Sequence, residues 1–369
     1  RSSDLTGFGN LSGFLSISNY LKLTHNRPLF MIDLRSDTVT KPTHEMLMHM
    51  TRADVGDDVF AEDPTVNAFE QRMADLFGME AGLFVPSGVM SNQLSLHVLT
   101  TPGDEVIIDE LGHVFNYESA SAAHLSSIQL RPIKGTRGKI TASLAESAIR
   151  TTNEWDPHTR VIAVENTTNK GGGACYTEQE LLEIKAVADE HGLFVHLDGA
   201  RIWNAMTATD KNPSFFGSVA DTISICFSKG LGAPVGSMML SSSEHKKQAR
   251  RYRKMWGGGM RQIGLLAAAA EYAVDNHWQL MKKDHERAQI FAKALHESDA
   301  FKIDLDTVES NIILFDPVDG SATDWVETFA DHGIGVVPFG PQTIRATFHF
   351  QITDEEFEQL LTFVASATA

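Results

Sequence analysis

Cysteine, excess positive charge and long apolar runs are all scarce in this 369-residue sequence. Cys175 and Cys226 are its two cysteines; they suggest no disulfide framework and lie at no metal-type spacing from histidine, so a reducing, cytoplasmic compartment and no metal site are predicted. With 31 Lys and Arg against 48 Asp and Glu, the net charge of −17 argues against nucleic acid as a general partner. No apolar run approaches the ~20 residues of a membrane span. We expect a soluble protein with no membrane partner.

The length of the chain predicts two domains, because one hydrophobic core rarely serves more than ~250–300 residues. Buried-type strands alternate with helices through most of the chain, a pattern typical of an α/β domain. After a long helix near residue 281 the pattern becomes α+β. We predict a large domain over 31–280 and a smaller domain over 281–369. Residues 1–30 are interpreted as a poorly ordered leader, with Met31 as the natural start; a transit peptide is the alternative.

One lysine follows a strand that reads as buried. The β-branched strand 223–227 leads to Lys229, and Gly230, Gly232 and Gly236 follow in the next loop. An ammonium group is costly to bury, and desolvation makes the amine a nucleophile able to form a Schiff base. Glycines let backbone approach a bound group closely. The alternative is a lysine that extends to water from the strand end.

Other strand ends carry groups that suit the same chemistry, and open α/β sheets bind ligands at that edge. The apolar strand 193–197 ends in Asp198. A buried carboxylate beside a pyridine nitrogen keeps that nitrogen protonated, which makes pyridoxal phosphate an electron sink. His113, after an earlier strand, could stack on the ring or move a proton. Asp198 as a turn former and His113 as a surface residue are the alternatives.

A predicted helix start offers a place for the phosphate. The strand 83–85 leads into Ser87, Gly88 and Val89, which open a helix. Helix N-termini present free N–H groups and the positive end of the dipole to anions. An ordinary capped helix start would look the same. The basic run 245–254, by contrast, is interpreted first as a solvated helix face.

Several long motifs occur in order along the chain: Ile32-Asp-Leu-Arg-Ser-Asp-Thr-Val-Thr, Val55-Gly-Asp-Asp-Val, Glu62-Asp-Pro-Thr-Val-Asn, Phe84-Val-Pro-Ser-Gly, His196-Leu-Asp-Gly-Ala-Arg-Ile, Phe227-Ser-Lys-Gly-Leu-Gly-Ala-Pro-Val-Gly-Ser and Arg253-Lys-Met-Trp-Gly-Gly-Gly-Met-Arg-Gln. With them the sequence resembles the threonine aldolases, from Met31 through the C-terminal domain. These enzymes have the aspartate-aminotransferase-like, type I fold of pyridoxal-phosphate enzymes. The resemblance implies a mainly parallel seven-stranded sheet flanked by helices, and a smaller α+β domain.

The resemblance also implies how the cofactor is held. Lys229 would be the Schiff-base lysine, Asp198 the partner of the ring nitrogen and His113 the ring-stacking histidine. Gly88 and Val89 would offer backbone N–H groups to the phosphate. The implied cofactor is pyridoxal 5′-phosphate.

The remaining implied residues bind the substrate or reach a second subunit. Ser36, Arg201 and Arg345 would bind the amino-acid carboxylate, Arg201 also lying against the cofactor; arginine suits this because its planar fork binds carboxylates in bidentate fashion. Lys254 and Arg261 would reach the phosphate region of a neighbouring subunit. That implies a homo-oligomer, either a dimer or a dimer of dimers (a homotetramer). Part of the basic run would then face an interface, and the rest would be solvated.

The implied activity is retro-aldol cleavage of threonine, allo-threonine and related β-hydroxy-α-amino acids to glycine and an aldehyde. Two positions depart from the family pattern: Val89 replaces a threonine, and Thr168 replaces a histidine that sits near the substrate β-hydroxyl. His113, or a water molecule that it positions, is then the candidate base. The alternatives are a β-eliminating lyase acting on a β-substituted amino acid and a non-catalytic relative.

Overall fold

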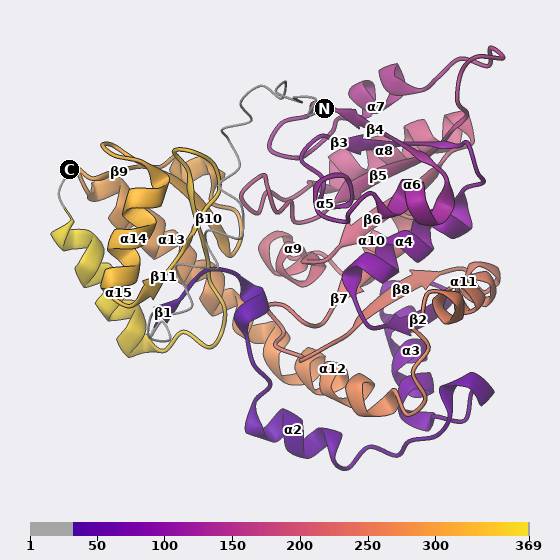
Figure 1. Cartoon of the computed structure of the whole chain (residues 1–369), viewed down its shortest axis with the longest axis horizontal. Helices are drawn as coiled ribbons and strands as arrows, with labels where there is room; N and C mark the ends of the chain where they lie inside the picture. Colours follow the sequence, from indigo (N-terminus) through magenta and orange to yellow (C-terminus); the bar gives the residue numbers. More distant parts are fainter. Residues whose placement is uncertain (1–31, 368–369) are drawn as a thin grey trace, which may run out of the picture.

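A seven-stranded sheet forms the centre of the larger part of the protein (Figure 1). The structure is a computed structural model that describes residues 32–367, so the predicted leader lies outside the described residues. Along the sheet the strands run in the order β2 (Ala81–Val85), β8 (Ser237–Ser241), β7 (Thr222–Cys226), β6 (Phe194–Gly199), β5 (Thr159–Glu165), β3 (Glu105–Asp109) and β4 (Gln129–Ile133). β8 pairs antiparallel with β7 and β2, and the other described pairs of this sheet are parallel. The mainly parallel sheet is confirmed.

Local capping chemistry sets where the helices begin and end. Asp63 Oδ1 accepts the Val66 N–H at the start of α3, Pro64 needs no N–H there, and Gly78 ends the helix at φ 66°. The helices that accompany the large sheet are α2 (His44–Met50), α3 (Pro64–Phe77), α4 (Gly88–Leu99), α5 (His113–Asn116), α6 (Ser121–Ser126), α7 (Ala142–Ala148), α8 (Glu178–His191), α9 (Ile202–Thr209), α10 (Pro213–Val219), α11 (Ser243–Met255) and α12 (Gly264–His277), with short 3₁₀ turns at Asp37–Val39, Asp58–Phe60 and Trp278–Leu280.

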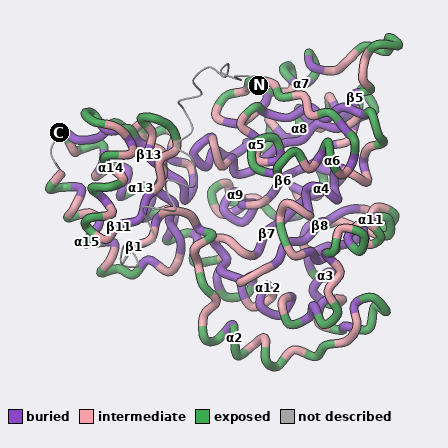
Figure 2. The backbone as a smooth tube through the Cα atoms, in the orientation of Figure 1, coloured by how far each residue is buried: buried purple, intermediate pink, exposed green. Residues whose placement is uncertain are grey.

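Both faces of the sheet are covered, as the buried strands in the middle of Figure 2 show. On one face Ile162, Leu197 and Ile225 belong to a core that includes side chains of α3, α8, α9 and α12. Residues of alternate parity, such as Val161 and Met239, face α4, α6 and α11 on the other side. Because side chains alternate across a strand, a sheet buried on both faces reads as continuous apolar runs.

A smaller antiparallel sheet organises the second core, on the left of Figure 1. Its order is β12 (Val337–Pro338), β13 (Ile344–Thr347), β10 (Ile312–Pro317) and β9 (Phe301–Lys302). The accompanying helices are α13 (Met281–Glu297), α14 (Ala322–Asp331) and α15 (Asp354–Ser366), with a 3₁₀ turn at Leu305–Thr307. β9 and β12 were not predicted. Met281 belongs to the first core and Ala288 to the second, so α13 spans both; the predicted boundary at residue 281 stays a prediction.

The N-terminal segment crosses from one core to the other. β1 (Ile32–Asp33) pairs in parallel with β11 (Ile334–Gly335), and Leu34 is fully buried in the second core. Further along, Met46 of α2 is buried in the first core. The polar residues between Leu34 and Met46 therefore pass between the two cores.

The basic run lies on α11, and the solvated interpretation is wrong for one of its residues. Arg253 is buried, donates to the Phe84 carbonyl at 2.6 Å and pairs with buried Asp58. Arg250 also bonds to Asp58. Two cations of the run thus bind the 3₁₀ turn Asp58–Phe60 through Asp58, and Arg253 also joins it to β2 through the Phe84 carbonyl. Among residues 32–367, no helix is long and apolar enough to cross a membrane, and both cysteines are buried free thiols.

Candidate active site

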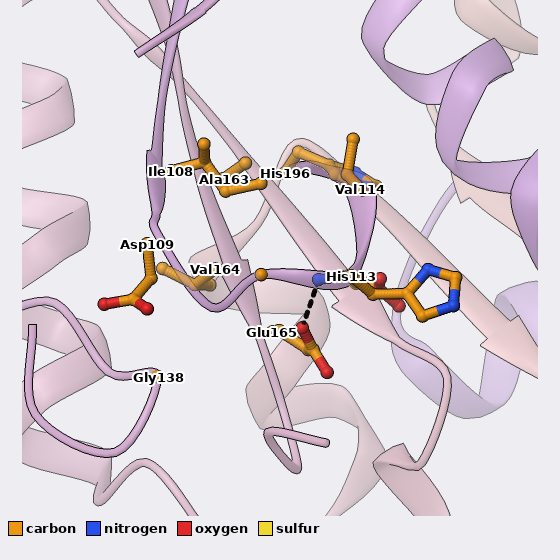
Figure 3. Close-up of a pocket in the computed structure, with 11 residues that line it drawn as sticks. Ile108, Asp109, His113, Val114, Gly138, Ala163, Val164, Glu165 and His196 are labelled. Carbon is orange, nitrogen blue, oxygen red and sulfur yellow. Dashed lines mark hydrogen bonds between the residues drawn. The ribbon is translucent and has the colours of Figure 1, made fainter. Parts of the chain in front are cut away.

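The carboxyl ends of three neighbouring parallel strands bring the predicted cofactor residues to one edge of the sheet. Glu165, the last residue of β5, lies in register with Asp198 on β6. β7 runs parallel beside β6, and Lys229 follows its last residue after a short loop. Figure 3 shows how His113 approaches this edge from the β3–α5 connection, its backbone N–H bonded to Glu165. The residues that end these strands in the sequence therefore lie at one edge of the sheet.

Asp198 is buried, and each of its carboxylate oxygens accepts one hydrogen bond. Its Oδ2 accepts from Asn92 Nδ2 at 2.9 Å, and its Oδ1 accepts the Ala200 N–H at 3.1 Å. Asn92 is a buried residue of α4 whose amide nitrogen also donates to Glu118 at 2.9 Å. His196 Nε2 lies 3.2 Å from Asn92 Oδ1 and sets the orientation of that amide. A carboxylate held in this way suits a cationic partner at its open side.

His113 is oriented by a buried carboxylate. Its Nδ1 lies 2.9 Å from Glu118 Oε1, and Glu118 Oε2 accepts from Gln93 at 2.6 Å. Burial lowers the pKa of His113, but the Glu118 hydrogen bond and the charges of Asp198 and Glu118 outweigh it, so that the pKa is raised. Polar atoms of His113, Glu118 and Asp198 lie within 4.8 Å of one another. The histidine and the predicted ring-nitrogen partner thus belong to one network.

Glu165 joins two segments of the site. Its Oε2 accepts the His113 N–H at 2.7 Å and its Oε1 accepts the Asn169 N–H at 2.8 Å. Burial and the neighbouring charge of Asp198 raise the pKa of Glu165 to about 7, although the two N–H donors oppose the shift. Glu165 therefore positions the backbone on both sides of the strand end.

The lysine loop is bound to the N-terminal segment. Thr40 Oγ1 lies 2.9 Å from the carbonyl oxygens of both Asp37 and Lys229. Asp37 is fully buried and receives two bonds from Arg201, 2.8 Å to Nε and 2.7 Å to Nη2. Burial alone would raise the pKa of Asp37, but Arg201, with Lys229 and Arg345, lowers it to about 2. The segment between the two cores thus supplies a permanent anion beside the lysine.

The three predicted carboxylate ligands lie along one line of contacts. Ser36 Oγ is 3.5 Å from Asp37 Oδ1, and Asp37 holds the Nε–Nη2 edge of Arg201. Arg201 Nη1 lies 3.4 Å from Asn169 Oδ1, which also accepts from Arg345 Nη1 at 2.9 Å. Asp37 thus engages the Nε–Nη2 edge of Arg201, and Nη1 points to Asn169, which also binds Arg345.

The start of α4 forms a tight cradle. Ser87 caps the helix by accepting the Met90 N–H, leaving Gly88 and Val89 in the first turn, whose N–H groups have no acceptor within a helix. A Cβ at Gly88 would lie 2.7 Å from Cys226 Sγ, so that only glycine fits. Val89 keeps the backbone donor at a position where the family commonly has a hydroxyl.

Three residues singled out in the sequence lie apart from these contacts: Lys254, Arg261 and Thr168. Lys254 and Arg261 are exposed, and Arg261 Nη1 donates to Asp57 at 2.8 Å. Thr168 is buried; its Oγ1 donates to the Arg137 carbonyl at 2.9 Å and its N–H donates to Ala174. The Thr168 hydroxyl is thus committed to the backbone and does not replace the histidine as a base.

The residues present fit pyridoxal phosphate. The cradle at Gly88 would hold the phosphate, Asp198 the ring nitrogen, and Lys229 the aldehyde carbon. A further sign is Asn166 Nδ2, a buried donor beside Glu165 with no hydrogen-bond partner among the described residues. A buried amide without a partner is costly, and an acceptor on a bound group would satisfy it.

Sequence reasoning did not assign roles to Asp37, Asn92, Glu118, Glu165 and Asn169. Asp37, Glu165 and Asn169 stand inside polar motifs that follow or link strands, and that placement was the available signal. Asn92 and Glu118 lie in helical and turn segments, and only the fold brings them to Asp198.

Comparisons with known proteins agree with this geometry. Residues 33–317 match the β-eliminating lyase family. The chain is 38% identical over 337 residues to a probable low-specificity L-threonine aldolase 2 of Arabidopsis thaliana, covering 89% of this chain and 95% of that protein. It is 40% identical over 278 residues to the low specificity L-threonine aldolase of Escherichia coli K12, covering 75% and 83% of the two chains.

Solved structures give the fold. A threonine aldolase from Leishmania major superposes with a TM-score of 0.78 at 20% identity, over 90% of this chain and 98% of that one. A serine palmitoyltransferase from Sphingomonas wittichii superposes with a TM-score of 0.71 at 18% identity, over 91% and 86%. Fold and site together define a pyridoxal-phosphate-dependent enzyme of fold type I, a lyase. Within that class, the chain belongs to the β-eliminating lyase family.

Proposed function

We propose that this enzyme cleaves L-threonine and L-allo-threonine by a retro-aldol reaction to glycine and acetaldehyde, and acts similarly on related β-hydroxy-α-amino acids. The observation that carries the proposal is that contacts join the lysine loop to the arginine pair: Thr40 Oγ1 lies 2.9 Å from the carbonyl oxygens of Lys229 and Asp37, and the Asp37 carboxylate accepts two hydrogen bonds from Arg201. An amino acid held by its carboxylate at the arginines would thus present its amino group and Cα toward the lysine. Relatives 36–40% identical to this chain carry the name low-specificity L-threonine aldolase.

The contacts of Arg201 and Arg345 support the proposed substrate-binding roles. Arg345 Nη1 and Arg201 Nη1 face one point, where a carboxylate oxygen would receive two charge-assisted hydrogen bonds. Asp37 holds Arg201 in place, and Ser36 lies at the end of this line. These residues bind and orient the amino acid.

The proton of the β-hydroxyl goes to His113, directly or through a water molecule, because Thr168 is engaged elsewhere. Glu118 orients the imidazole and stabilises the protonated form that results. Bound pyridoxal phosphate supplies an electron sink for the pair released from the Cα–Cβ bond, and Asp198 is the carboxylate that would keep its ring nitrogen protonated. Lys229 supplies the amine that attaches to the cofactor.

The test is an assay of the purified holoenzyme with threonine, allo-threonine and phenylserine in both enantiomers, measuring aldehyde and glycine. We expect Lys229→Ala to lose both turnover and the borohydride-reducible link to the cofactor, which is detected as added mass on the reduced protein. The matched control is Lys302→Ala, at an exposed lysine of β9. A reducible link that persists in Lys229→Ala would refute the role of this residue.

A second candidate reaction is β-elimination on a β-substituted amino acid, favoured by the family match over residues 33–317. The two reactions need the same lysine and the same carboxylate site but release different products. Pyruvate and ammonia, in place of glycine and acetaldehyde, would identify β-elimination.

We also propose that the enzyme works as a homo-oligomer, a dimer or a dimer of dimers, in which Lys254 and Arg261 reach the phosphate region of a neighbouring subunit. Support comes from apolar side chains near these cations: Phe60 is 70% exposed and Met255 is 66% exposed. Exposed apolar surface beside cations is typical of an interaction surface. The molar mass in solution tests this, and a monomer with full activity would contradict it.

A further inference from the structure

The point between the two arginines is filled by a side chain of the protein itself. Asn169 Oδ1 lies 2.9 Å from Arg345 Nη1 and 3.4 Å from Arg201 Nη1. Because both guanidinium groups only donate, the atom between them must be an acceptor, and the amide oxygen is the acceptor that asparagine offers. One oxygen between two arginine donors is the arrangement expected for one oxygen of a bound carboxylate.

The side chain of Asn169 can leave this position without moving the backbone. Its N–H is bound to Glu165 Oε1 at 2.8 Å, and its carbonyl accepts the Gly172 N–H at 3.3 Å. These bonds anchor the main chain at the end of β5, while the amide group is attached only by rotatable bonds. A rotamer change would move the amide away from the arginines without breaking either main-chain hydrogen bond.

The local charge favours an anion in place of the amide. Arg201 and Arg345 carry two positive charges, and Asp37, bonded to Arg201, carries one negative charge. A carboxylate in place of the neutral amide would add a negative charge directly beside both guanidinium groups. Hydrogen bonds from arginine to a charged oxygen are roughly twice as strong as those to a neutral one.

We propose that Asn169 is a displaceable carboxylate surrogate: its Oδ1 holds the Arg201–Arg345 pair in the free enzyme, and the substrate carboxylate replaces it. Asn169 is thus a positioning residue that holds the two arginines together and must be displaced before a carboxylate binds between them. The inference rests on the proposed function in that the ligand is an α-amino acid. The neutral side chain of Asn169 matters, because an aspartate there would bind both arginines with its own charge and would be harder to displace.

The test measures equilibrium binding to the holoenzyme by calorimetry, with glycine as the carboxylate ligand and glycinamide as the ligand that lacks the carboxylate. We expect Asn169→Ala to lower the Kd of glycine by about threefold to tenfold, since one net hydrogen-bond contribution no longer has to be displaced. We expect Asn169→Asp to raise the Kd of glycine at least about tenfold. The Kd of glycinamide should change less than about twofold in both variants.

Asn169→Ser, which keeps the backbone donor and shortens the side chain, serves as a second truncation, and Asn276→Ala, at an exposed asparagine of α12, is the matched control. A Kd for glycine that rises or stays constant in both truncations would overturn the proposal, because Asn169 would then support the bound state. Turnover of threonine is measured separately. If the proposed function is wrong, the wild-type enzyme will not cleave threonine. The role of Asn169 is tested separately, by the ratio of the glycine Kd in each variant to that in the wild type.

Discussion

Replacing Asp37 by asparagine tests the electrostatic logic of the site. Asp37 is fully buried, Arg201 is 6% exposed, and two hydrogen bonds of 2.8 and 2.7 Å join them. The pKa of Asp37 falls from 3.8 to about 2; at about 1.36 kcal/mol for each pKa unit, ionisation of this group contributes about 2 kcal/mol to stability. Breaking a buried pair from one side costs more, about 3–5 kcal/mol, because the remaining charge is left uncompensated.

The assay is urea unfolding, with Asp299→Asn, at an exposed aspartate, as the control. We expect Asp37→Asn to lose about 3–5 kcal/mol of unfolding free energy at pH 7. Because the folded-state pKa is lowered, the contribution of Asp37 is present above pH 3.8 and is lost as the pH falls toward 2. The variant should lack that part of the acid dependence.

A double-mutant cycle with Arg201→Met isolates the pair. Each single change leaves a buried charge or dipole without its partner, so the double variant should be more stable than the sum of the two losses predicts, by about 2 kcal/mol. A loss below about 1 kcal/mol in Asp37→Asn, or no coupling in the cycle, would refute the reasoning.

Two further predictions concern the cofactor side of the site. Glu118→Gln weakens the hydrogen bond and removes the charge by which Glu118 raises the pKa of His113, so the acidic limb of the pH profile of kcat/KM should move to lower pH. Exposed Glu110→Gln should leave the limb in place, and an unmoved limb in Glu118→Gln would contradict His113 as the base. Gly88→Ala places a Cβ 2.7 Å from Cys226 Sγ, so the unfolding free energy of the apoenzyme should fall by about 1–3 kcal/mol and the affinity for the cofactor should drop. Gly340→Ala, where a Cβ meets no close neighbour, is the control. A normal cofactor Kd in Gly88→Ala would contradict a phosphate-binding role for the start of α4.

The parts of the fold that the sequence predicts are those governed by local chemistry. Asp63 and Pro64 start α3 and Gly78 ends it because capping acts over three or four residues. β4 was not predicted: it is an edge strand of mostly half-exposed residues that contains Pro132, and its pairing with β3 is a tertiary event. Arg253 shows the same limit, since its partner Asp58 lies far away in the sequence.

The residues of the site also fall into two groups, those that the sequence predicts and those that only the folded chain brings together. Lys229 and Asp198 could be found because each ends an apolar strand and parallel strands end at a common edge. Asn92 and Glu118 could not, because their roles consist of hydrogen bonds to Asp198 and His113 that only the folded chain creates. Asn169 between the arginines likewise depends on the placement of two separate cores.

Because its two residues lie in different cores, the arginine pair can join the two parts of the protein. Arg201 lies at the start of α9 in the first core, and Arg345 lies on β13 in the second. An amino acid bound by both arginines would link the first core to the second without a covalent bond. In the free enzyme, Asn169 makes that link through its contacts with the two arginines. Ligand occupancy is therefore tied to how stiffly the two cores are joined, so the same contacts that recognise the substrate also set the rigidity of the whole molecule.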